Sequence, residues 1–492
     1  MAQDENDVYE VAEAEGHRAS ILYGTAGDVL IVMGALALLI VLTFITGNPA
    51  LSAAAIALVP MTFLFCMKPV RLVYAITVYS FVLGFLTNDL HAPSVAKYVC
   101  DGLLVLALIF AVVQPKAGYE STPAVKRIGL GFLLFWLVAT CSAILNGVSP
   151  LLYLWACRTN FRLFGFLYCC IRLLTQDDVE KIMRFFLVFF WVSLLVSTFQ
   201  YFIQHADQDH VNGLFGTGSG ANAMINVLMF AMTAYHLFSY SAGEIGLRRL
   251  IAVAAACCYL SGIAEIKIFY VELPLLIALT VILQKPNSKT VITVALALAA
   301  LVFGIQILVA FNPGYASYFS LENIIESSST GGYSDAYNLN RLTAVSTLDA
   351  RFMSTMQSHL IGLGFGAGQY CQYFASPLYE LYGEILRWSW FTDASIFLET
   401  GWVGLIFYAA TLALTAIGAF QNRRCQKGNS AVVRMSLSMA VLSLVLIVYN
   451  CTLTTDPGCY FVASLFSFSF VLSSDGGVAG AHASLIGRAR IE

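Results

Sequence analysis

The sequence predicts an all-α polytopic integral membrane protein, and three observations support that fold class. Hydrophobic residues make up 59% of the 492 residues, and charged residues only 11%. Apolar runs of about 15 to 20 residues recur along the chain, and a helix needs about this length to cross a bilayer. The runs do not alternate apolar and polar residues as the strands of an outer-membrane barrel do, so we expect helices.

We expect about 14 transmembrane helices from these runs. Their ranges are 29–46, 50–67, 72–87, 98–113, 128–145, 151–174, 185–204, 223–240, 250–264, 266–283, 291–311, 394–420, 435–453 and 459–472. The chain then has a polar N-terminal tail, a first block of helices, one long polar loop, a second block of helices and a C-terminal tail. The bounds of these parts are 1–27, 28–311, 312–393, 394–472 and 473–492.

The basic residues predict the orientation of the helices. Lysine and arginine accumulate in the cytoplasmic loops of membrane proteins, and most of the 26 lysines and arginines here fall in alternate loops. This pattern places both termini in the cytoplasm and the loop 312–393 outside. The N-terminal tail lacks the basic start and apolar core of a cleaved signal peptide, so the first apolar run is expected to target the chain.

Seven lysines and arginines break this pattern, because they lie inside an apolar run or on the outer side. They are Lys97, Arg158, Arg162, Lys267, Arg341, Arg351 and Arg387. A cation in the middle of a membrane helix costs about 2.5–3.5 kcal/mol, so it is expected to face a cavity and a partner. Arginine offers a planar fork to phosphate oxygens. A cationic cavity in the membrane therefore suggests a lipid-linked phosphate or diphosphate as ligand.

Three of these cations also have a purely structural interpretation. Arg158 and Arg162 are four residues apart on one helix face, where two positive charges repel unless an anion lies between them. They could instead snorkel to the outer headgroups. Lys267 could simply pair with Glu265 or Glu272.

The cysteines and glycine-rich segments predict no cofactor. Most of the 12 cysteines lie in apolar runs and are expected to pack there, and Cys451 and Cys459 form the one plausible disulfide. The His and Asp residues of HADQDHVNG (205–213) could bind a metal, but a solvated turn is the commoner role of such a cluster, and no metal is expected. GLGFGAG and GTGSG follow no strand, which argues against dinucleotide binding.

Four segments together resemble one family of membrane proteins. Arg351 and Gly362 form an R-x10-G pattern, and HLIGLGFGAG after it resembles a glycine turn of that family. NRLTAVSTLDARF, with Arg341, resembles the segment before the pattern, and FLETGWVGLIFY, with Glu399, resembles the start of the helix after the loop. NGLFGTGSGANA, with Asn222, resembles an earlier helix entry. The family is the bacterial O-antigen polymerase and O-antigen ligase superfamily.

The resemblance implies a GT-C-like architecture and a membrane glycosyltransferase. Such an enzyme polymerises undecaprenyl-diphosphate-linked oligosaccharide repeat units at the outer face of the bacterial inner membrane, in exopolysaccharide, capsule or O-antigen biosynthesis. The implied partners are the lipid-linked oligosaccharide, a chain-length-regulating co-polymerase and a flippase. No cofactor and no nucleic acid partner is expected.

In this chemistry a sugar hydroxyl attacks the anomeric carbon and the lipid diphosphate leaves. The reaction needs cations around the leaving charge and a base for the hydroxyl. The expected diphosphate ligands are Arg158, Arg162, Lys267, Arg341, Arg351 and Arg387. The candidate bases are Asp393, His359 and Glu399. Ligases of the superfamily carry a histidine just before the last E-x-G helix, where this chain has WSWFTDAS, so Asp393 is the nearest titratable group there.

Two other functions stay open at this stage. An enzyme of the ligase type would move a glycan from its lipid carrier to a different acceptor. A flippase or transporter of a lipid-linked saccharide would use a similar number of helices and a cationic cavity. The lack of a two-fold internal repeat and the long external loop favour a polymerase.

Overall fold

The computed structural model describes residues 68–116, 119, 121–218, 222–284, 287–311, 313–315, 321–329, 332, 337–371, 373–422 and 430–488. The chain divides into two compact units, 1–74 and 75–492. The described part of the first unit is short and contains the start of helix α3. The other described residues belong to the second unit, and α3 spans the boundary between the two units.

The described residues form helices almost throughout. The helices and strands are α3 (Val70–Gly84), α4 (Tyr98–Val113), α5 (Pro123–Leu145), α6 (Pro150–Leu173), α7 (Gln176–Phe202), α8 (Asn222–Ala242), α9 (Leu247–Ile263), α10 (Ile268–Leu283), α11 (Ser288–Phe311), α12 (Leu321–Ser329), α13 (Ala344–Phe352), α14 (Met356–Ile361), β1 (Tyr370–Cys371), β2 (Phe374–Ala375), α15 (Glu384–Leu386), α16 (Thr392–Asn422), α17 (Ser430–Tyr449) and α18 (Gly458–Arg488). The two strands pair antiparallel, with Tyr370 opposite Ala375.

Eight helices in the described ranges are long and apolar enough to cross a membrane. They are Val70–Asp89, Val95–Val113, Pro123–Leu145, Gln176–Phe202, Asn222–Ala242, Ser288–Phe311, Thr392–Asn422 and Ala431–Tyr449. Helices α10 and the first part of α18 are apolar but shorter. Helix α6 carries Arg158 and Arg162 in its middle and is not in this set. The prediction of an all-α membrane protein is confirmed at this level.

The expected helices from 72–87 onward all form helices, and 29–46 and 50–67 lie outside the described residues. Local signals set several boundaries. Thr122 and Ser149 cap α5 and α6, whose first residues are prolines. Thr175 and Asp178 form a capping box at the start of α7, which begins well before the expected 185. The apolar pattern missed that first stretch of α7 because it is polar.

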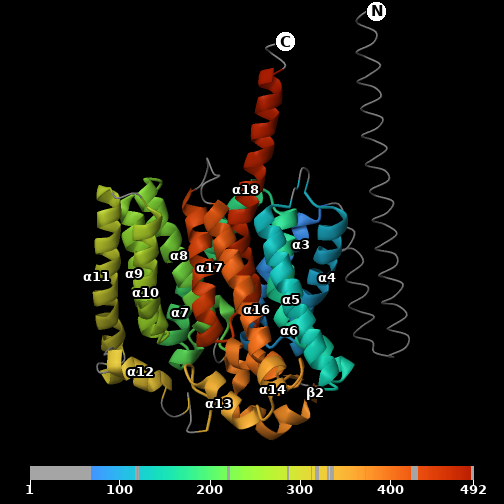
Figure 1. Ribbon diagram of the computed structural model, residues 1–492. Coiled ribbons are helices and arrows are strands. Elements are labelled where there is room, and N and C mark those ends of the chain that lie inside the picture. Colours follow the sequence, from blue (N-terminus) through green and yellow to red (C-terminus); the bar gives the residue numbers. More distant parts are fainter. Residues whose placement is uncertain are drawn as a thin grey trace, which may run out of the picture. The chain divides into compact units, whose positions relative to one another are not determined.

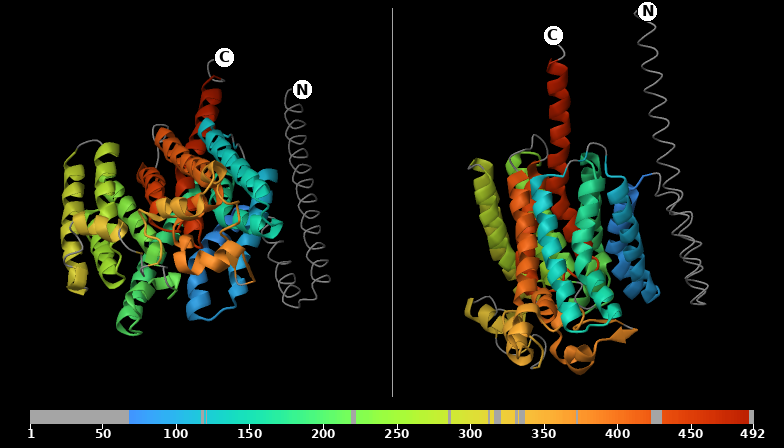
Figure 2. Two further views of the ribbon diagram at one scale, coloured as in Figure 1. Left: turned by 60° about the horizontal axis from the view of Figure 1, so that its bottom comes forward. Right: turned by 45° about the vertical axis from the view of Figure 1, so that its right-hand side comes forward.

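The segment 337–393, expected as part of a long polar loop, has a core of its own. Leu348 of α13 and Trp388 pack with Phe397 of α16, each at most 1% exposed. Figure 1 shows α13 and α14 at one end of the helices and the C-terminal end of α18 at the other. When that end is turned forward, the segment lies across the ends of the helices (Figure 2). The segment is therefore a folded cap on the helices.

Two expectations need correction. Cys451 and Cys459 are both free thiols, and the Cys459 sulfur lies 3.9 Å from Asp456 Oδ1 instead. The last helix, expected to end at 472, continues to Arg488, so most of the expected tail 473–492 is helical.

Candidate functional site

The glycine turn 362–368 wraps around a break in helix α16. At Gly401 the backbone of α16 leaves helical geometry, with φ 63° and ψ −166°. A Cβ there would lie 2.5 Å from the carbonyl carbon of Leu360, and a Cβ on Gly362 would lie 2.5 Å from the carbonyl carbon of Glu399. Only glycine permits this approach with a positive φ. Ser142 of α5 donates to the carbonyl oxygens of both Ile361 and Glu399, and so joins a third element to the break.

The break holds the side chain of Glu399 inside the glycine turn. Its Oε1 accepts hydrogen bonds from the backbone N–H of Gly368 (3.1 Å) and the amide of Gln369 (2.9 Å). Its Oε2 is buried and has no hydrogen-bond partner among the described residues. Trp388 closes the turn by donating to the Gly368 carbonyl at 3.1 Å. One carboxylate oxygen is thus fixed, and the other is free to accept a proton.

The paired arginines of α6 lie between two aspartates of the chain. Arg158 Nε is 2.7 Å from Asp101 Oδ2, and Arg162 Nη1 is 2.5 Å from Asp456 Oδ2. The crossed distances are 3.6 Å for Arg162 to Asp101 and 4.0 Å for Arg158 to Asp456. Arg162 also donates to the Thr454 carbonyl, at 2.8 Å. The anion expected between the arginines is therefore supplied by α4 and by the turn before α18.

The two arginines differ in exposure. The Arg162 side chain is 6% exposed, whereas that of Arg158 is 20% exposed. The Arg158 guanidinium also lies over the rings of Trp155, at 4.6 Å, and Tyr98, at 5.2 Å. Arg158 is therefore the more accessible member of the pair.

Two hydrogen bonds join this face of α6 to the residues that directly follow the glycine turn. Trp155 Nε1 donates to the Tyr370 carbonyl at 3.1 Å, and Thr159 Oγ1 donates to Gln369 Oε1 at 3.3 Å. Since the Gln369 amide also holds Glu399, a continuous polar path runs from Thr159 on α6 to Glu399 on α16. Two of the predicted sites thus lie in one neighbourhood.

The other predicted cations lie elsewhere. Arg351, exposed on α13, lies 5.3 Å from the ring of Tyr382. Arg341 lies over the Tyr449 ring at 4.3 Å. Arg387 pairs with Glu384 within its own turn. No ion pair or hydrogen bond in the described part of the chain joins these three arginines to α6.

Lys267 pairs with Glu265 at 3.0 Å, as one interpretation of the sequence proposed. From the sequence, Glu272 was also a possible partner of Lys267. Glu272 contacts Asn226 instead. Lys97 lies 5.5 Å from the ring of Tyr98, beside the α6 arginines.

The remaining candidate bases have different surroundings. His359 Nδ1 lies 2.7 Å from Asp349 Oδ1, and the side chains are 38% and 31% exposed. Asp393 is buried at the start of α16, where its Oδ1 accepts from the backbone N–H of Ala394 at 2.7 Å. Asp393 is therefore enclosed at the N-terminal end of α16, whereas His359 is oriented by a carboxylate on the surface of the cap.

Reasoning from the sequence missed Asp101, Asp456, Trp155 and Gln369. Asp101 carried a usable signal, because an acidic residue inside the apolar run YVCDGLLVLALIF is as exceptional as an arginine. Asp456 and Gln369 lie in turns, where polar residues are ordinary, so no sequence signal distinguished them.

In the described ranges, no three His, Cys, Asp or Glu residues lie together as metal ligands. Within 205–213, Asp209 accepts from Asn222, and His210 contacts the Thr217 carbonyl.

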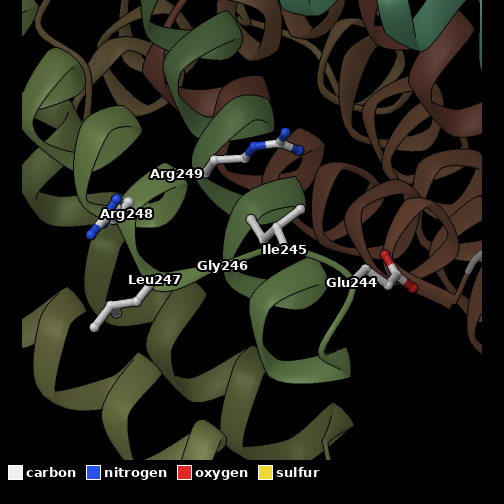
Figure 3. A pocket seen from close by; sticks show the side chains of 6 residues that line it. All are labelled: Glu244, Ile245, Gly246, Leu247, Arg248 and Arg249. Atoms are coloured by element: carbon white, nitrogen blue, oxygen red, sulfur yellow. The ribbon is translucent and has the colours of Figure 1, made fainter.

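A shallow hollow at the turn between α8 and α9 is lined by 244–249. There the side chains of Arg248 and Arg249 point in different directions (Figure 3). This turn lies at the opposite end of the helices from the cap (Figure 1).

No protein-family model matches this chain, and no curated protein matches it either.

Proposed function

We propose that this chain is a membrane glycosyltransferase that polymerises oligosaccharide units carried on a lipid diphosphate, at the outer face of a bacterial cytoplasmic membrane. The observation that carries the proposal is the polar path from Thr159, next to Arg158 on α6, through Gln369 to Glu399. The path connects the neighbourhood of a cationic group that is suited to bind a diphosphate with a carboxylate that is suited to act as a base. Both lie beside the folded cap, which supplies the glycine turn.

Each group has a definite role in this reaction. An acceptor hydroxyl forms a new C–O bond to the anomeric carbon, and the bond from that carbon to the diphosphate oxygen breaks. The leaving diphosphate keeps the electron pair, and Arg158 stabilises its charge. The hydroxyl proton passes to Oε2 of Glu399, whose other oxygen is fixed by Gly368 and Gln369.

The remaining candidates take secondary roles in the proposal. Arg162 holds Asp456 and Asp101 in place, so that Arg158 can exchange a carboxylate for a phosphate oxygen. His359 with Asp349 is the second candidate base. Arg351 and Arg341 line the cap, where they can guide the anionic carrier toward the site. The chain-length regulator and the flippase remain proposed partners.

The test uses the purified full chain in liposomes with a fluorescent lipid-linked oligosaccharide. A polymerase produces a ladder of longer glycans. Transfer to an added second acceptor without lengthening indicates a ligase-type enzyme, and movement between leaflets without new bonds indicates a flippase. Either of the last two results, or no ladder at any substrate concentration, overturns the proposal.

The assignment of the base is tested separately. Glu399→Gln removes the proton acceptor and keeps the shape of the side chain, so we expect a loss of at least about 100-fold in glycan lengthening. His359→Gln serves as the comparison. If His359→Gln abolishes lengthening and Glu399→Gln does not, the base is His359.

A further inference from the structure

A second polar site lies among α8, α10 and their neighbours. Asn226 of α8 donates its Nδ2 to both carboxylate oxygens of Glu272 on α10, at 2.9 and 3.1 Å. Glu272 is 2% exposed and Asn226 is 1% exposed. A carboxylate buried to this degree is normally paired with a cation or bonded by several donors. Here its only hydrogen-bond donor among the described side chains is one neutral amide.

No lysine, arginine or histidine in the described residues pairs with Glu272. Lys267, five residues earlier, pairs with Glu265. The other titratable side chains of the packed helices have separate contacts or lie near helix ends. They include Tyr270 (with Ser261), Tyr235 (against the His236 ring), His236 (with the Met232 carbonyl), Tyr240 (near the end of α8), Cys257 (with Thr233), Lys289 and Arg434 (near the starts of α11 and α17) and Tyr449 (under Arg341).

The same contact leaves an acceptor without a donor. Asn226 Oδ1 is buried and has no hydrogen-bond partner in the described part of the chain. The site therefore has an excess of oxygen acceptors over donors, and one bound cation would correct that excess.

We propose that Glu272 and Asn226 bind one monovalent cation, a proton or Na⁺, between the Glu272 carboxyl group and Asn226 Oδ1. A proton from solvent converts the carboxylate into a carboxylic acid, whose O–H donates to Oδ1 while Nδ2 donates to the other oxygen. All four polar atoms are then satisfied in a reciprocal acid–amide pair. Na⁺ satisfies the same two oxygens as ligands. The proposal does not depend on the proposed glycosyl transfer.

The test measures the melting temperature of the purified full chain. One series varies pH in choline chloride, and a second replaces choline by Na⁺ at fixed pH. Glu272→Gln is the test variant, because glutamine has the shape of the acid and its own N–H₂ can donate to Asn226 Oδ1. Glu244→Gln, at the exposed turn after α8, is the matched control.

The cation stabilises the folded state, because the unfolded chain has no such site. If the ligand is a proton, the wild-type melting temperature falls by about 1–4 °C relative to Glu272→Gln as pH rises. If the ligand is Na⁺, the wild type gains a similar amount on exchange of choline for Na⁺, and Glu272→Gln does not. Glu244→Gln follows the wild type in both series. Parallel curves for the wild type and Glu272→Gln in both series overturn the proposal.

Infrared difference spectra give a second readout that needs only the wild type and a mild variant. A protonated Glu272 gives a carboxylic C=O band that disappears on raising the pH and shifts in Asn226→Ser. A cation site with Na⁺ gives instead a carboxylate band that shifts on Na⁺ addition. If the wild type shows neither of these band changes, the proposal of a cation at this pair is contradicted.

Discussion

Two regions of this protein place charge among membrane helices, and they solve that problem in different ways. Around α6, two arginines and two aspartates neutralise one another and connect to the cap. Between α8 and α10, a single carboxylate faces a neutral amide. In Figure 1, α9, α10 and α11 lie on one side of the helices, and α4, α5 and α6 lie on the other. In the α6 network each charged side chain needs its oppositely charged partners to remain stable. At the second site a bound proton can neutralise the Glu272 carboxylate, so the fold does not require its negative charge.

Deleting a buried charge from the α6 network is expected to have the largest effect. Arg162→Leu leaves Asp456 without its closest partner and removes the second partner of Asp101, so we expect a loss of about 3–5 kcal/mol in the free energy of unfolding. Thermal unfolding in detergent measures the loss. The double variant with Asp456→Asn should recover part of it, and no recovery would show that the pair is not coupled.

The break in α16 is expected to be almost as sensitive. Gly401→Ala adds a Cβ that would lie 2.5 Å from the Leu360 carbonyl carbon at a φ of 63°. The strained backbone alone costs about 1–3 kcal/mol, and the steric overlap adds to it. Gly129→Ala in α5 is the control, because nothing lies within 4 Å of its added Cβ. Equal melting temperatures for the two variants would mean that the cap does not depend on this break.

Arg158 separates function from stability within the network. Its side chain is 20% exposed, so Arg158→Ala should cost less stability than Arg162→Leu. If Arg158 contacts the diphosphate, the variant loses about 1.5–3 kcal/mol of binding, which is at least tenfold in rate or affinity. Glycan lengthening per folded molecule measures this. A fully active Arg158→Ala would leave the α6 arginines with a structural role alone.

Arg351 tests whether the cap contributes to binding of the carrier. Its contacts to Tyr382 and Phe352 are exposed cation–π contacts, so Arg351→Ala should cost about 0.5–1 kcal/mol of stability. If it guides a diphosphate, lengthening falls sharply even in Arg351→Lys, which keeps the charge and loses the planar fork. Unchanged affinity and turnover in Arg351→Ala would remove the anion-binding role from the cap.

The smallest effect is expected at the second polar site, and it completes the comparison. At a pH where Glu272 is protonated, Glu272→Gln should change the free energy of unfolding by less than about 1 kcal/mol, because the reciprocal pair survives. Thermal unfolding under that condition, beside Arg162→Leu, measures the contrast. A loss as large as that of Arg162→Leu would show that Glu272 carries a needed negative charge.

The sequence by itself determined the long apolar helices. A long uncharged run satisfies its backbone only as a helix, so the apolar runs from 72–87 to 459–472 predicted each of these helices without knowledge of their neighbours. The capping residues Thr122 and Ser149 act within one turn, so they are also readable in sequence. The same locality explains why Glu399 and the glycine turn could be recognised as motifs.

Only the tertiary structure decided which charges meet. The partners of Arg158 and Arg162 are Asp101, 57 residues away, and Asp456, 294 residues away. Spacing along a helix predicted that the arginines share a face, but no local pattern identifies an aspartate on α4 or in the turn before α18 as their partner. From the sequence, Glu272 was a possible partner of Lys267. The packing of α8 against α10 instead places Glu272 in contact with Asn226. An ion pair depends on distance in space, and the packing of helices sets that distance.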